Sequence, residues 1–297
     1  MPQYPWVSVV VPTHNRKGNV IELIQSVRNS AYPPDKIEII VVDDASTDGT
    51  YENLQRLFPE IKVIRNITEK LPSASRNAGL KSTRGDFIFL IDDDNVITAT
   101  SINELIRVFL SNGDVGLAGP IALYGSRREK IWCAGGQIRP PLFIHRHLLQ
   151  YRNIEDLPAT ARKATIEVDY IPNAFMVRRE IVDRGGLFDE RLPIGWEEID
   201  LAIRIREMGY KTVLCTSALI FHDVPFSQEV HINKTRAFWR GRDRVVFYRK
   251  HLPLRCLLIP FDVLGFLALV VRLKVQLENV WEYIRGTREG ITTKVSR

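Results

Sequence analysis

The sequence predicts an α/β fold in which a parallel β-sheet is flanked by helices. Three apolar runs, residues 7–11, 37–42 and 87–91, have the composition of buried strands, and each is followed by polar residues and then by a segment with helical periodicity. Strands that alternate with helices form parallel sheets with right-handed crossovers. Ligands bind beyond the carboxyl ends of such strands, so the polar residues after each run are the first candidates for a functional site.

The elements follow one another in a regular order. In the first half the predicted strands are residues 7–11, 37–42, 61–64, 87–91 and 115–120, and the predicted helices lie near residues 20–27, 54–58, 73–81 and 100–110. Residues 121–168 show no clear period, and we assign no chemistry to them. In the second half the pattern predicts a strand within residues 169–179, a helix from Glu197 to Met208 closed by Gly209, a strand at 219–222 and a helix over 234–250.

Composition sets broad limits on the class of protein. The chain has 297 residues, of which 45% are hydrophobic, so it can bury a core and form one large or two modest domains. Cys133, Cys215 and Cys256 lie far apart, which predicts neither a disulfide framework nor a zinc site and favours a reducing compartment. The amino terminus lacks a basic patch followed by an apolar run, so no secretory signal is expected.

The positive charge is concentrated at one end of the chain. The formal net charge is +6, yet residues 223–297 contain 14 Lys and Arg against 7 Asp and Glu, while residues 1–222 contain 27 against 28. A basic last quarter suits nucleic acid, an anionic membrane surface or a diphosphate substrate.

Three adjacent carboxylates follow the strand at residues 87–91. Asp92, Asp93 and Asp94 repel one another, and a divalent cation would explain why they stand together at a strand end. Oxygen-rich sites suit Mg²⁺ or Mn²⁺, which bridge carboxylates to the phosphates of nucleotides. The sequence has no glycine-rich dinucleotide fingerprint and no P-loop, so a metal is expected to hold the phosphates. The alternative is that the acids only cap the helix that begins near Thr100.

Four motifs in the first 95 residues resemble, in order, the signatures of the family 2 inverting glycosyltransferases. They are VSVVVPTHNR at residues 7–16, VVDDASTDGT at 41–50, SRNAGL at 75–80 and FIFLIDDDN at 87–95. The resemblance implies the GT-A fold, a Rossmann-like mixed sheet flanked by helices, and a nucleotide-sugar donor linked to GDP, UDP or dTDP. It implies that Asp43 or Asp44 holds the nucleobase and ribose side, and that the acids at 92–94 form a D-x-D site. Further donor-binding residues are expected at Pro12, Thr13, Asn15, Arg76, Asn77, Asp92 and Asp93.

Two of these expectations have plain structural alternatives. Asp43 and Asp44 could form a solvated turn after their strand, and Arg76 could be an exposed cation on a helix.

The segment GWEEIDLAIR at residues 195–204 resembles the acceptor side of the same family. There the second acid of a pair removes the proton of the acceptor hydroxyl, which implies that Glu198 is the catalytic base. Glu197 is the reserve candidate, Asp200 is the third acidic residue of the catalytic group, and Trp196 is the expected acceptor-binding residue. A positioned carboxylate typically contributes about 10²–10⁴-fold to such a reaction. The alternative is that both acids only stabilise the amino end of the helix.

A histidine follows the short apolar strand at residues 219–221. The family often completes its metal site with a histidine at this point, which implies that Asp92, Asp94 and His222 bind Mn²⁺ or Mg²⁺, with Asp94 as the principal ligand. A histidine at a strand end that only makes structural hydrogen bonds is the alternative.

The carboxyl-terminal region suggests contact with a membrane. The basic and aromatic helix at 234–250 carries Arg242 and Arg244, which could bind the donor diphosphate or could face solvent or lipid. The apolar run at residues 256–271 would span roughly 24 Å as a helix, short of the roughly 30 Å hydrocarbon core, although a tilted single span becomes possible with its flanks. An amphipathic stripe follows, formed by Leu273, Leu277, Val280, Trp281 and Ile284. A hydrophobic helix docked on the catalytic domain or in a dimer is the alternative.

These observations predict a domain plan and a function. Residues 1–222 are expected to form the catalytic domain, with a nucleotide-sugar half at 1–119 and an acceptor half at 120–222, followed by a basic helical segment at 223–251 and membrane-associating helices at 252–297. The predicted function is transfer of a mannose- or rhamnose-type sugar to a lipid-linked or surface glycan, at the cytoplasmic face of the cell membrane, with membrane contact through residues 252–285. Transfer to a polyprenyl phosphate, as in dolichol-phosphate mannosyltransferases, is the enzymatic alternative. A nucleic-acid-binding protein is the non-enzymatic one; it leaves the acids at 92–94 without a purpose, so nucleic acid is not an expected partner.

Overall fold

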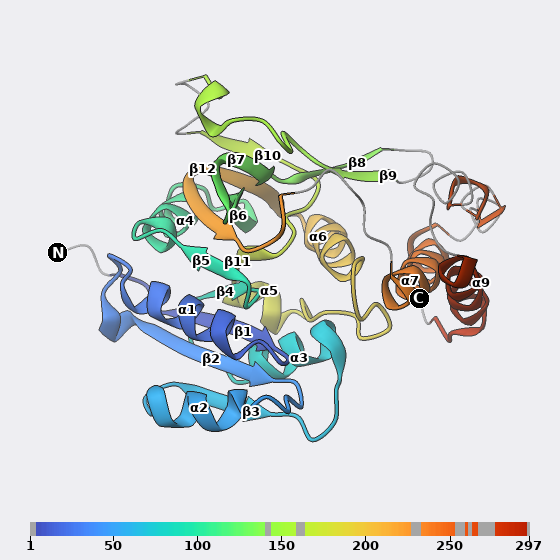
Figure 1. The fold of residues 1–297 in the computed structure, drawn as a ribbon. Helices are drawn as coiled ribbons and strands as arrows, with labels where there is room; N and C mark the ends of the chain where they lie inside the picture. Colours follow the sequence, from blue (N-terminus) through green and yellow to red (C-terminus); the bar gives the residue numbers. More distant parts are fainter. Residues whose placement is uncertain are drawn as a thin grey trace. The chain divides into compact units, whose positions relative to one another are not determined.

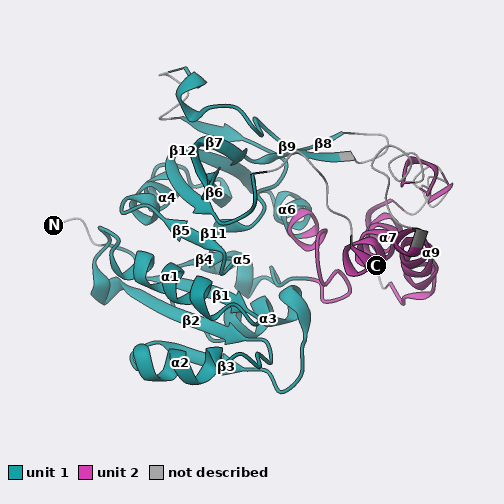
Figure 2. Cartoon of the chain, in the orientation of Figure 1, with its two compact units in different colours: residues 1–188, 201–226 teal, residues 189–200, 227–297 magenta. Residues whose placement is uncertain are grey.

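The protein contains two compact units (Figure 2). The computed structural model describes residues 4–139, 144–158, 164–226, 233–252, 259–260, 263–266 and 277–295. The first unit comprises residues 1–188 and 201–226, and the second comprises residues 189–200 and 227–297. The first unit ends at residue 226, and residues 189–200 group with the carboxyl-terminal part. The division into catalytic, basic and membrane-associating segments stays a prediction.

The first unit is an α/β fold whose helices connect the strands of one large sheet (Figure 1). Its first half contains β1 (Val7–Thr13), α1 (Lys17–Arg28), the 3₁₀ turn η1 (Pro34–Lys36), β2 (Ile37–Asp43), α2 (Thr50–Leu57), β3 (Lys62–Arg65), α3 (Leu71–Leu80), β4 (Phe87–Ile91), β5 (Asn95–Ile97) and α4 (Ser101–Ser111). Its second half contains β6 (Val115–Tyr124), β7 (Arg127–Cys133), β8 (Gly136–Arg139), β9 (Ile144–His147), η2 (Ile154–Asp156), β10 (Thr165–Glu167), β11 (Ala174–Arg178), α5 (Arg179–Asp183) and β12 (Lys211–His222). Helix α6 (Glu197–Glu207) begins in the second unit and ends in the first.

The sheet is parallel on one side and mixed on the other. The strand order is β10-β12-β6-β11-β4-β1-β2-β3, with β5 paired to β12 and β7 paired to β6. Strands β3, β2, β1 and β4 are parallel, as the sequence predicts. Strand β11 lies antiparallel between β4 and β6, so the purely parallel sheet expected from strand and helix alternation is wrong beyond β4, and the mixed sheet implied by the family resemblance is correct.

Alternate residues of each central strand bury different helices. Val7, Val9 and Val11 of β1 share one hydrophobic cluster with residues of α1, α2 and α4. Val10 belongs to a second cluster, which includes residues of α3, α5 and α6. This period-2 alternation within a mainly apolar run is what a strand covered on both faces requires. The sheet is therefore packed on both faces, and the loops of the site follow the carboxyl ends of its parallel strands.

The unpredicted region at residues 121–168 contains strands that extend this sheet. Strand β6 continues to Tyr124 and forms a hairpin with β7, while β8 and β9 form a separate two-stranded sheet. Strand β12 is longer than the predicted run at 219–222 and pairs its end, His222, with Asn95 of the short strand β5. The missed elements are short and pair over long sequence distances, so local periodicity does not reveal them.

The second unit is organised by α7 (Lys234–His251) and α9 (Leu277–Thr292), which approach each other through glycines. A Cβ atom added to Gly241 would lie 2.3 Å from the Tyr283 carbonyl oxygen, and one added to Gly286 would lie 2.1 Å from the Phe238 carbonyl oxygen. Backbone therefore meets backbone at this contact. The buried residues of α9 include Asn279, Tyr283, Gly286, Thr287 and Gly290.

This contact does not use the apolar stripe that the sequence assigns to a membrane-associating helix, and membrane association stays a prediction. The predicted apolar stripe of α9 is not the face that the helix buries: Trp281 is 62% exposed, and Val280 and Ile284 are only partly buried. Most of the apolar run at 256–271, and Leu273 of the stripe, lie outside the described residues. Among the helices that are described, none combines the length and the apolar character that crossing a bilayer requires.

Candidate active site

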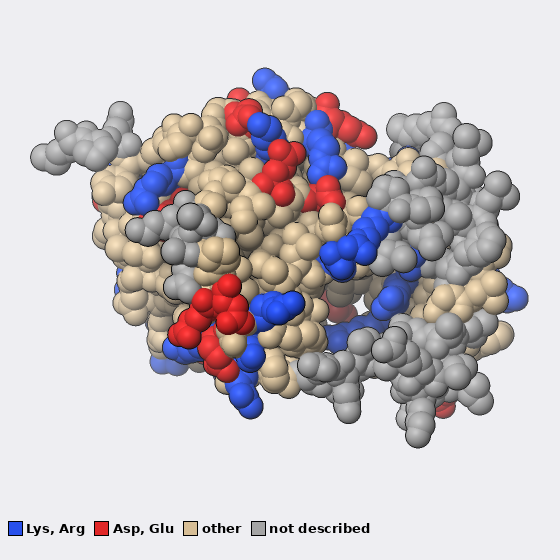
Figure 3. Space-filling model, turned by 90° about the horizontal axis from the view of Figure 1, so that it is seen from above, with Lys and Arg blue, Asp and Glu red and all other residues tan. Residues whose placement is uncertain are grey.

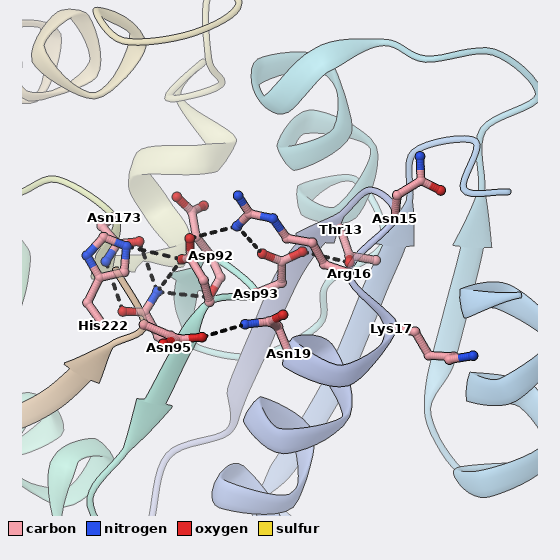
Figure 4. Close-up of polar contacts among 12 residues, drawn as sticks. Thr13, Asn15, Arg16, Lys17, Asn19, Asp92, Asp93, Asn95, Asn173 and His222 are labelled. Atoms are coloured by element: carbon pink, nitrogen blue, oxygen red, sulfur yellow. Dashed lines mark hydrogen bonds and ion pairs between the residues drawn. The ribbon is translucent and has the colours of Figure 1, made fainter. Parts of the chain in front are cut away.

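The acidic turn after β4 is held from both sides by main-chain and asparagine contacts. The Asp92 amide donates to the Asn173 carbonyl at 3.0 Å, and the Asp94 carbonyl accepts from the Asp223 amide at 2.7 Å. Asn95 is buried beneath the turn, and its Nδ2 donates to the Asp92 carbonyl at 2.9 Å (Figure 4). The three carboxylates are thus fixed at the carboxyl edge of the sheet, where the sequence predicts them.

Each of the three carboxylates contacts a residue that the other two do not, and Asp93 and Asp94 also share Arg16. Asp92 Oδ1 accepts from Arg76 Nη2 at 2.6 Å. Asp93 accepts from Thr13 Oγ1 at 2.7 Å, and Asp94 Oδ1 lies 3.3 Å from His222 Nε2. None of these contacts caps helix α4, whose first turn begins beyond strand β5, so the alternative of a capping role is wrong.

Burial and charge separate the pKa values of two neighbouring acids. Burial raises the pKa of Asp93 to about 7, against the hydrogen bond from Thr13 and the charge of Arg16, which lower it. Burial also favours a higher pKa for Asp94, but the hydrogen bond and charge of His222, together with the charge of Arg16, outweigh it and lower the pKa. Asp94 is therefore the more readily ionised of the two, which suits the principal metal ligand.

The expected metal ligands are brought together only in part. Asp94 and His222 lie side by side, whereas Asp92 is engaged by Arg76. Within the part of the chain that the structure describes, no three His, Cys, Asp or Glu side chains are grouped closely enough to bind a metal ion. Two protein ligands still fit an ion that takes its remaining ligands from water and a diphosphate, and Nδ1 of the buried His222 has no hydrogen-bond partner. The donor set of a carboxylate and an imidazole suits Mn²⁺ better than Mg²⁺.

His222 is oriented by aromatic rings that sequence reasoning missed. The indole of Trp132, on β7, meets the His222 ring edge-to-face with centroids 4.2 Å apart, and its centroid lies 4.6 Å from that of the His147 ring. Burial lowers the pKa of His147 to about 4, with a smaller contribution from the charge of His222. Trp132 and His147 come from the region without clear period, so no local pattern identifies them.

The adjacent acids Asp43 and Asp44 have separate roles. Both are buried, so the alternative of a solvated turn is wrong. Asp44 accepts hydrogen bonds from the side chain of Asn66 at 2.7 Å and from the amides of Lys70 and Leu71 at 2.8 Å each, and so anchors the start of α3. The carboxylate oxygens of Asp43 make no hydrogen bond, although Arg65 Nε lies 3.6 Å away. Asp43 is thus the acid with unused acceptor capacity, but it is 0% exposed, so its contact with a nucleoside stays a prediction.

Hydrogen bonds join the loop that follows β1 to the loop that follows β2. Asn15 Oδ1 accepts from the Thr47 amide at 2.7 Å, and the Asn15 amide donates to Ser46 Oγ at 2.9 Å. Asn15 and Ala45 both adopt positive φ angles, 52° and 60°, a conformation that costs free energy in residues other than glycine and concentrates at functional sites. Pro12 lies in β1, beside Val42 of β2.

Helix α3 carries two of the predicted donor residues. The Arg76 side chain is only 4% exposed and lies over the Phe188 ring, so the alternative of an exposed helix cation is wrong. Asn77 is buried, and its side-chain amide accepts from the Phe188 amide at 2.8 Å and donates to the Phe188 carbonyl at 2.9 Å. These contacts give Asn77 a structural function, and its role in donor binding stays a prediction.

The second unit contains the predicted catalytic acids. Glu198 is partly exposed, while Glu197 is 3% exposed. Asp200 is fully buried, with Oδ1 2.6 Å from Lys250 Nζ and 2.7 Å from His251 Nε2. These ion pairs give Asp200 a structural function, and its catalytic role stays a prediction. A base must reach its substrate, and Glu198 is the acid whose exposure fits that role.

The other predicted residues of this unit are also held by its own groups. Trp196 is 4% exposed, and its ring lies against Phe247 with centroids 4.6 Å apart, so it packs at the start of α6. Its role in acceptor binding stays a prediction. Arg242 Nη1 donates to Asp243 Oδ1 at 2.6 Å, and Arg244 Nε donates to the Tyr248 hydroxyl at 2.8 Å. Diphosphate binding by either arginine stays a prediction.

In sequence the chain is similar to known glycosyltransferases. A sequence model described as "Glycosyl transferase family 2" matches residues 8–186. The probable glycosyltransferase YdaM of Bacillus subtilis (strain 168) is 25% identical over 280 residues, which are 90% of this chain and 62% of that protein. The dolichol-phosphate mannosyltransferase of Pyrococcus furiosus is 31% identical over 179 residues, which are 60% of this chain and 47% of that protein. This chain therefore spans less than two thirds of the length of either relative.

In structure the chain is similar to a mannosyltransferase. PcManGT from Pyrobaculum calidifontis, solved in complex with GDP-Man and Mn²⁺, superposes with a TM-score of 0.59 and 18% sequence identity, over 97% of this chain and 74% of that one. At this identity the likeness establishes the fold, which is α/β and GT-A-like.

Proposed function

Because the chain belongs to glycosyl transferase family 2, we propose that it is a metal-dependent, inverting enzyme that transfers a sugar from a nucleoside-diphosphate donor to a hydroxyl group of a lipid-linked or surface glycan. The observation that supports this most directly is the contact between Asp94 and His222 beside Asp92 and Asp93, at the carboxyl edge of the sheet. A carboxylate and an imidazole beside further acids suit a cation that is shared with a diphosphate.

The donor is proposed to bind across the loops of the first unit. Asp43 accepts a hydrogen bond from the nucleoside, and Asp92 and Asp93 face its ribose. Asp94 and His222 would hold Mn²⁺ or Mg²⁺, which neutralises charge on the departing diphosphate when it is bound. The ion pair between the buried Arg76 and the partly exposed Asp92 keeps this edge in place while the donor enters and leaves.

Glu198 is the proposed general base. The acceptor oxygen forms a bond to the anomeric carbon on the side opposite the diphosphate, and its proton passes to the Glu198 carboxylate. The bond from the anomeric carbon to the phosphate oxygen breaks, and the nucleoside diphosphate leaves with that electron pair. A displacement of this kind inverts the configuration at the anomeric carbon.

The donor can be identified by a thermal-shift panel. GDP-mannose, UDP-GlcNAc and dTDP-rhamnose are each added with Mn²⁺, with Mg²⁺ and with EDTA. GDP-mannose is the first choice because the names of PcManGT and of the Pyrococcus furiosus relative both indicate mannose. A donor at 100 times its Kd raises the stability by about 2.7 kcal/mol. Stabilisation that needs both one donor and a metal, and that Asp94→Asn abolishes, is the expected result; no response to any donor would contradict the proposal.

Transfer to a polyprenyl phosphate is the second candidate reaction, because a named dolichol-phosphate mannosyltransferase is 31% identical over 179 residues. A phosphate oxygen is already ionised and needs no base. Glu198→Gln should therefore abolish transfer to a hydroxyl but leave transfer to a polyprenyl phosphate largely intact. The two acceptors, assayed with the same variant, distinguish the reactions.

Work at the cytoplasmic face of a membrane is proposed from the second unit. Trp281 is 62% exposed on α9, and Arg285 and Arg288 are exposed on the same helix. Indole rings and basic side chains favour the interface of anionic bilayers. Flotation with vesicles of phosphatidylglycerol and phosphatidylcholine tests the proposal: Trp281→Glu should reduce binding, and equal binding by the variant and the wild type would contradict it.

A nucleic-acid-binding function is less well supported. On the face drawn in Figure 3, the described Lys and Arg side chains alternate with Asp and Glu side chains. Binding to DNA or RNA that weakens steeply with salt would favour this alternative.

A further inference from the structure

A guanidinium group bridges two carboxylates of the acidic turn. Arg16 Nη1 lies 2.7 Å from Asp94 Oδ2 and 3.1 Å from Asp93 Oδ1, so one nitrogen contacts both acids. Figure 4 shows Arg16 reaching the acids from the loop after β1, on the side away from His222. His222 contacts the other oxygen of Asp94, Oδ1. Arg16 and His222 therefore each contact one oxygen of the Asp94 carboxylate.

The position of Arg16 is explained by the acids and not by its own helix. Arg16 is the N-cap residue of α1, its side chain makes no capping hydrogen bond, and the first turn of α1 contains no acidic residue. The positive end of the helix dipole disfavours a cation there. The carboxylates of Asp93 and Asp94 are the attraction that holds the guanidinium in place.

Arg16 differs from the other arginine of the cluster in its freedom to move. The Arg76 side chain is 4% exposed and contacts the Phe188 ring, whereas the Arg16 side chain is 51% exposed. The two acids it bridges are buried, at 6% and 14%. A half-exposed arginine can leave these acids without opening the core, and Arg76 cannot.

We propose that Arg16 is a resident counter-ion that neutralises Asp93 and Asp94 until the divalent cation displaces it, and that the displaced guanidinium then binds the diphosphate of the donor. The proposal rests on the proposed function, because it needs a cation on Asp94. A guanidinium on Oδ2 and a divalent ion on the same carboxylate repel each other, so binding of one disfavours the other. Planar guanidinium groups bind phosphate oxygens in pairs, which gives the displaced side chain a new partner.

The test compares Arg16→Met with a matched control, Arg28→Met. Arg28 belongs to the same helix and has nearly the same exposure, 52%, but it pairs with Glu60. Binding of Mn²⁺ alone, without nucleotide, is measured from the electron paramagnetic resonance signal of the free ion. We expect Arg16→Met to bind Mn²⁺ about tenfold more tightly than the wild type, because a competing positive charge is lost. Arg16→Lys keeps the charge and should stay near the wild type, as should Arg28→Met.

A second measurement tests the donor half of the proposal. With Mn²⁺ saturating, GDP and UDP are titrated into the wild type and into Arg16→Met, and the nucleotide that binds the wild type should bind the variant about tenfold more weakly. The variant thus changes metal and nucleotide affinity in opposite directions, which a general loss of structure cannot do. Unchanged or weaker Mn²⁺ binding by Arg16→Met would overturn the counter-ion role while leaving the metal site intact. Mn²⁺ binding by the wild type only when GDP or UDP is present would overturn the displacement of Arg16 by the metal alone. Failure of the wild type to bind Mn²⁺ even with GDP or UDP would instead overturn the proposed metal dependence, and this inference with it.

Discussion

Asn95 and Asn173 exchange two side-chain hydrogen bonds, each 2.9 Å long. Both side chains are buried, and Asn173 adopts a φ angle of 72°, which asparagine tolerates better than most residues. The same two residues contact the main chain of Asp92, one at its carbonyl and the other at its amide. The amide pair therefore sets the direction in which the acidic turn presents its carboxylates.

Replacing Asn173 should loosen this turn. Asn173→Ala leaves the buried Asn95 amide short of its partner and places an alanine at positive φ, at a cost of about 2–4 kcal/mol in the free energy of unfolding. Urea denaturation measures the loss, and Mn²⁺ affinity should fall with it. The control is Asn29→Ala, an exposed position after α1, which should change the stability by less than about 0.5 kcal/mol. Equal urea midpoints for the two variants would show that the amide pair is not needed.

Gly79 sets the distance between α3 and the sheet. A Cβ added there would lie 2.4 Å from Val10 Cγ1, so Gly79→Val must push the helix away from β1. We expect a loss of about 2–4 kcal/mol and weaker donor binding, because Arg76 moves with the helix. Gly18→Ala is the matched control: Gly18 is also helical, nothing lies within 4 Å of its added Cβ, and the variant should gain about 0.4–1 kcal/mol. A neutral Gly79→Val would contradict the close approach.

Replacing Glu198 should reduce activity and leave stability unchanged, whereas replacing Asp200 should reduce stability and largely spare activity. Glu198→Gln keeps the fold and should reduce kcat for a hydroxyl acceptor by about 10²–10⁴-fold. Asp200→Asn removes the buried charge between Lys250 and His251 and should cost about 3 kcal/mol or more in stability. Its kcat per folded molecule, measured well below its Tm, should stay within about tenfold of the wild type. A stable Asp200→Asn variant with no activity would instead support a catalytic role for Asp200.

Two further acids of the second unit should give opposite pH dependences of stability. Burial raises the pKa of Asp243 to about 7, although the hydrogen bond and charge of Arg242 oppose it. Asp243 therefore stabilises the fold below its unfolded pKa, near 4, and this contribution is lost as the pH rises through about 7. Any loss of stability in Asp243→Asn relative to the wild type should therefore shrink as the pH rises, and at pH 8 the variant should be as stable as the wild type or more stable.

Asp189 is the matched acid with the reverse sign. Burial acts to raise its pKa, but hydrogen bonds from Arg191 and Lys250 outweigh it, so the pKa is lowered. Its stabilisation is present above the unfolded pKa and is lost as the pH falls through the folded value. Asp189→Asn should thus be less stable than the wild type at pH 7, with the difference shrinking in acid. Thermal denaturation from pH 2 to pH 8 measures both variants, because the Asp189 effect is lost only below its unfolded pKa, near 4. Parallel pH profiles would refute the assignment.

The sequence predicts the first half of this fold well for a physical reason. Strands β1, β2 and β4 are covered on both faces, so they appear as mainly apolar runs, and the residues that end them must meet at one edge. Thr13, Asp43 and Asp92 are therefore found at the correct edge without any structure. Which of two adjacent acids is free cannot be predicted, because the difference between Asp43 and Asp44 depends on the amides of Lys70 and Leu71, far along the chain.

Long-range contacts explain the remaining failures. Trp132 orients His222, and Asn173 holds Asn95, but each pair is separated by tens of residues and follows no local period. Arg16 lies inside a quoted motif, yet only the structure shows that its side chain reaches the acids. In α9 the apolar period identifies a stripe that includes Val280 and Ile284. The face that packs on α7 instead contains glycines, which let the two backbones touch, and no apolar period reveals it.

That glycine contact limits how the second unit can evolve. Gly241, Gly286 and Gly290 bring α7 and α9 together, and glycine has no side chain that could become smaller. Every substitution there adds atoms where the backbone of the other helix already lies. Sequence drift at these positions can proceed in one direction only, and each step in it must separate the helices.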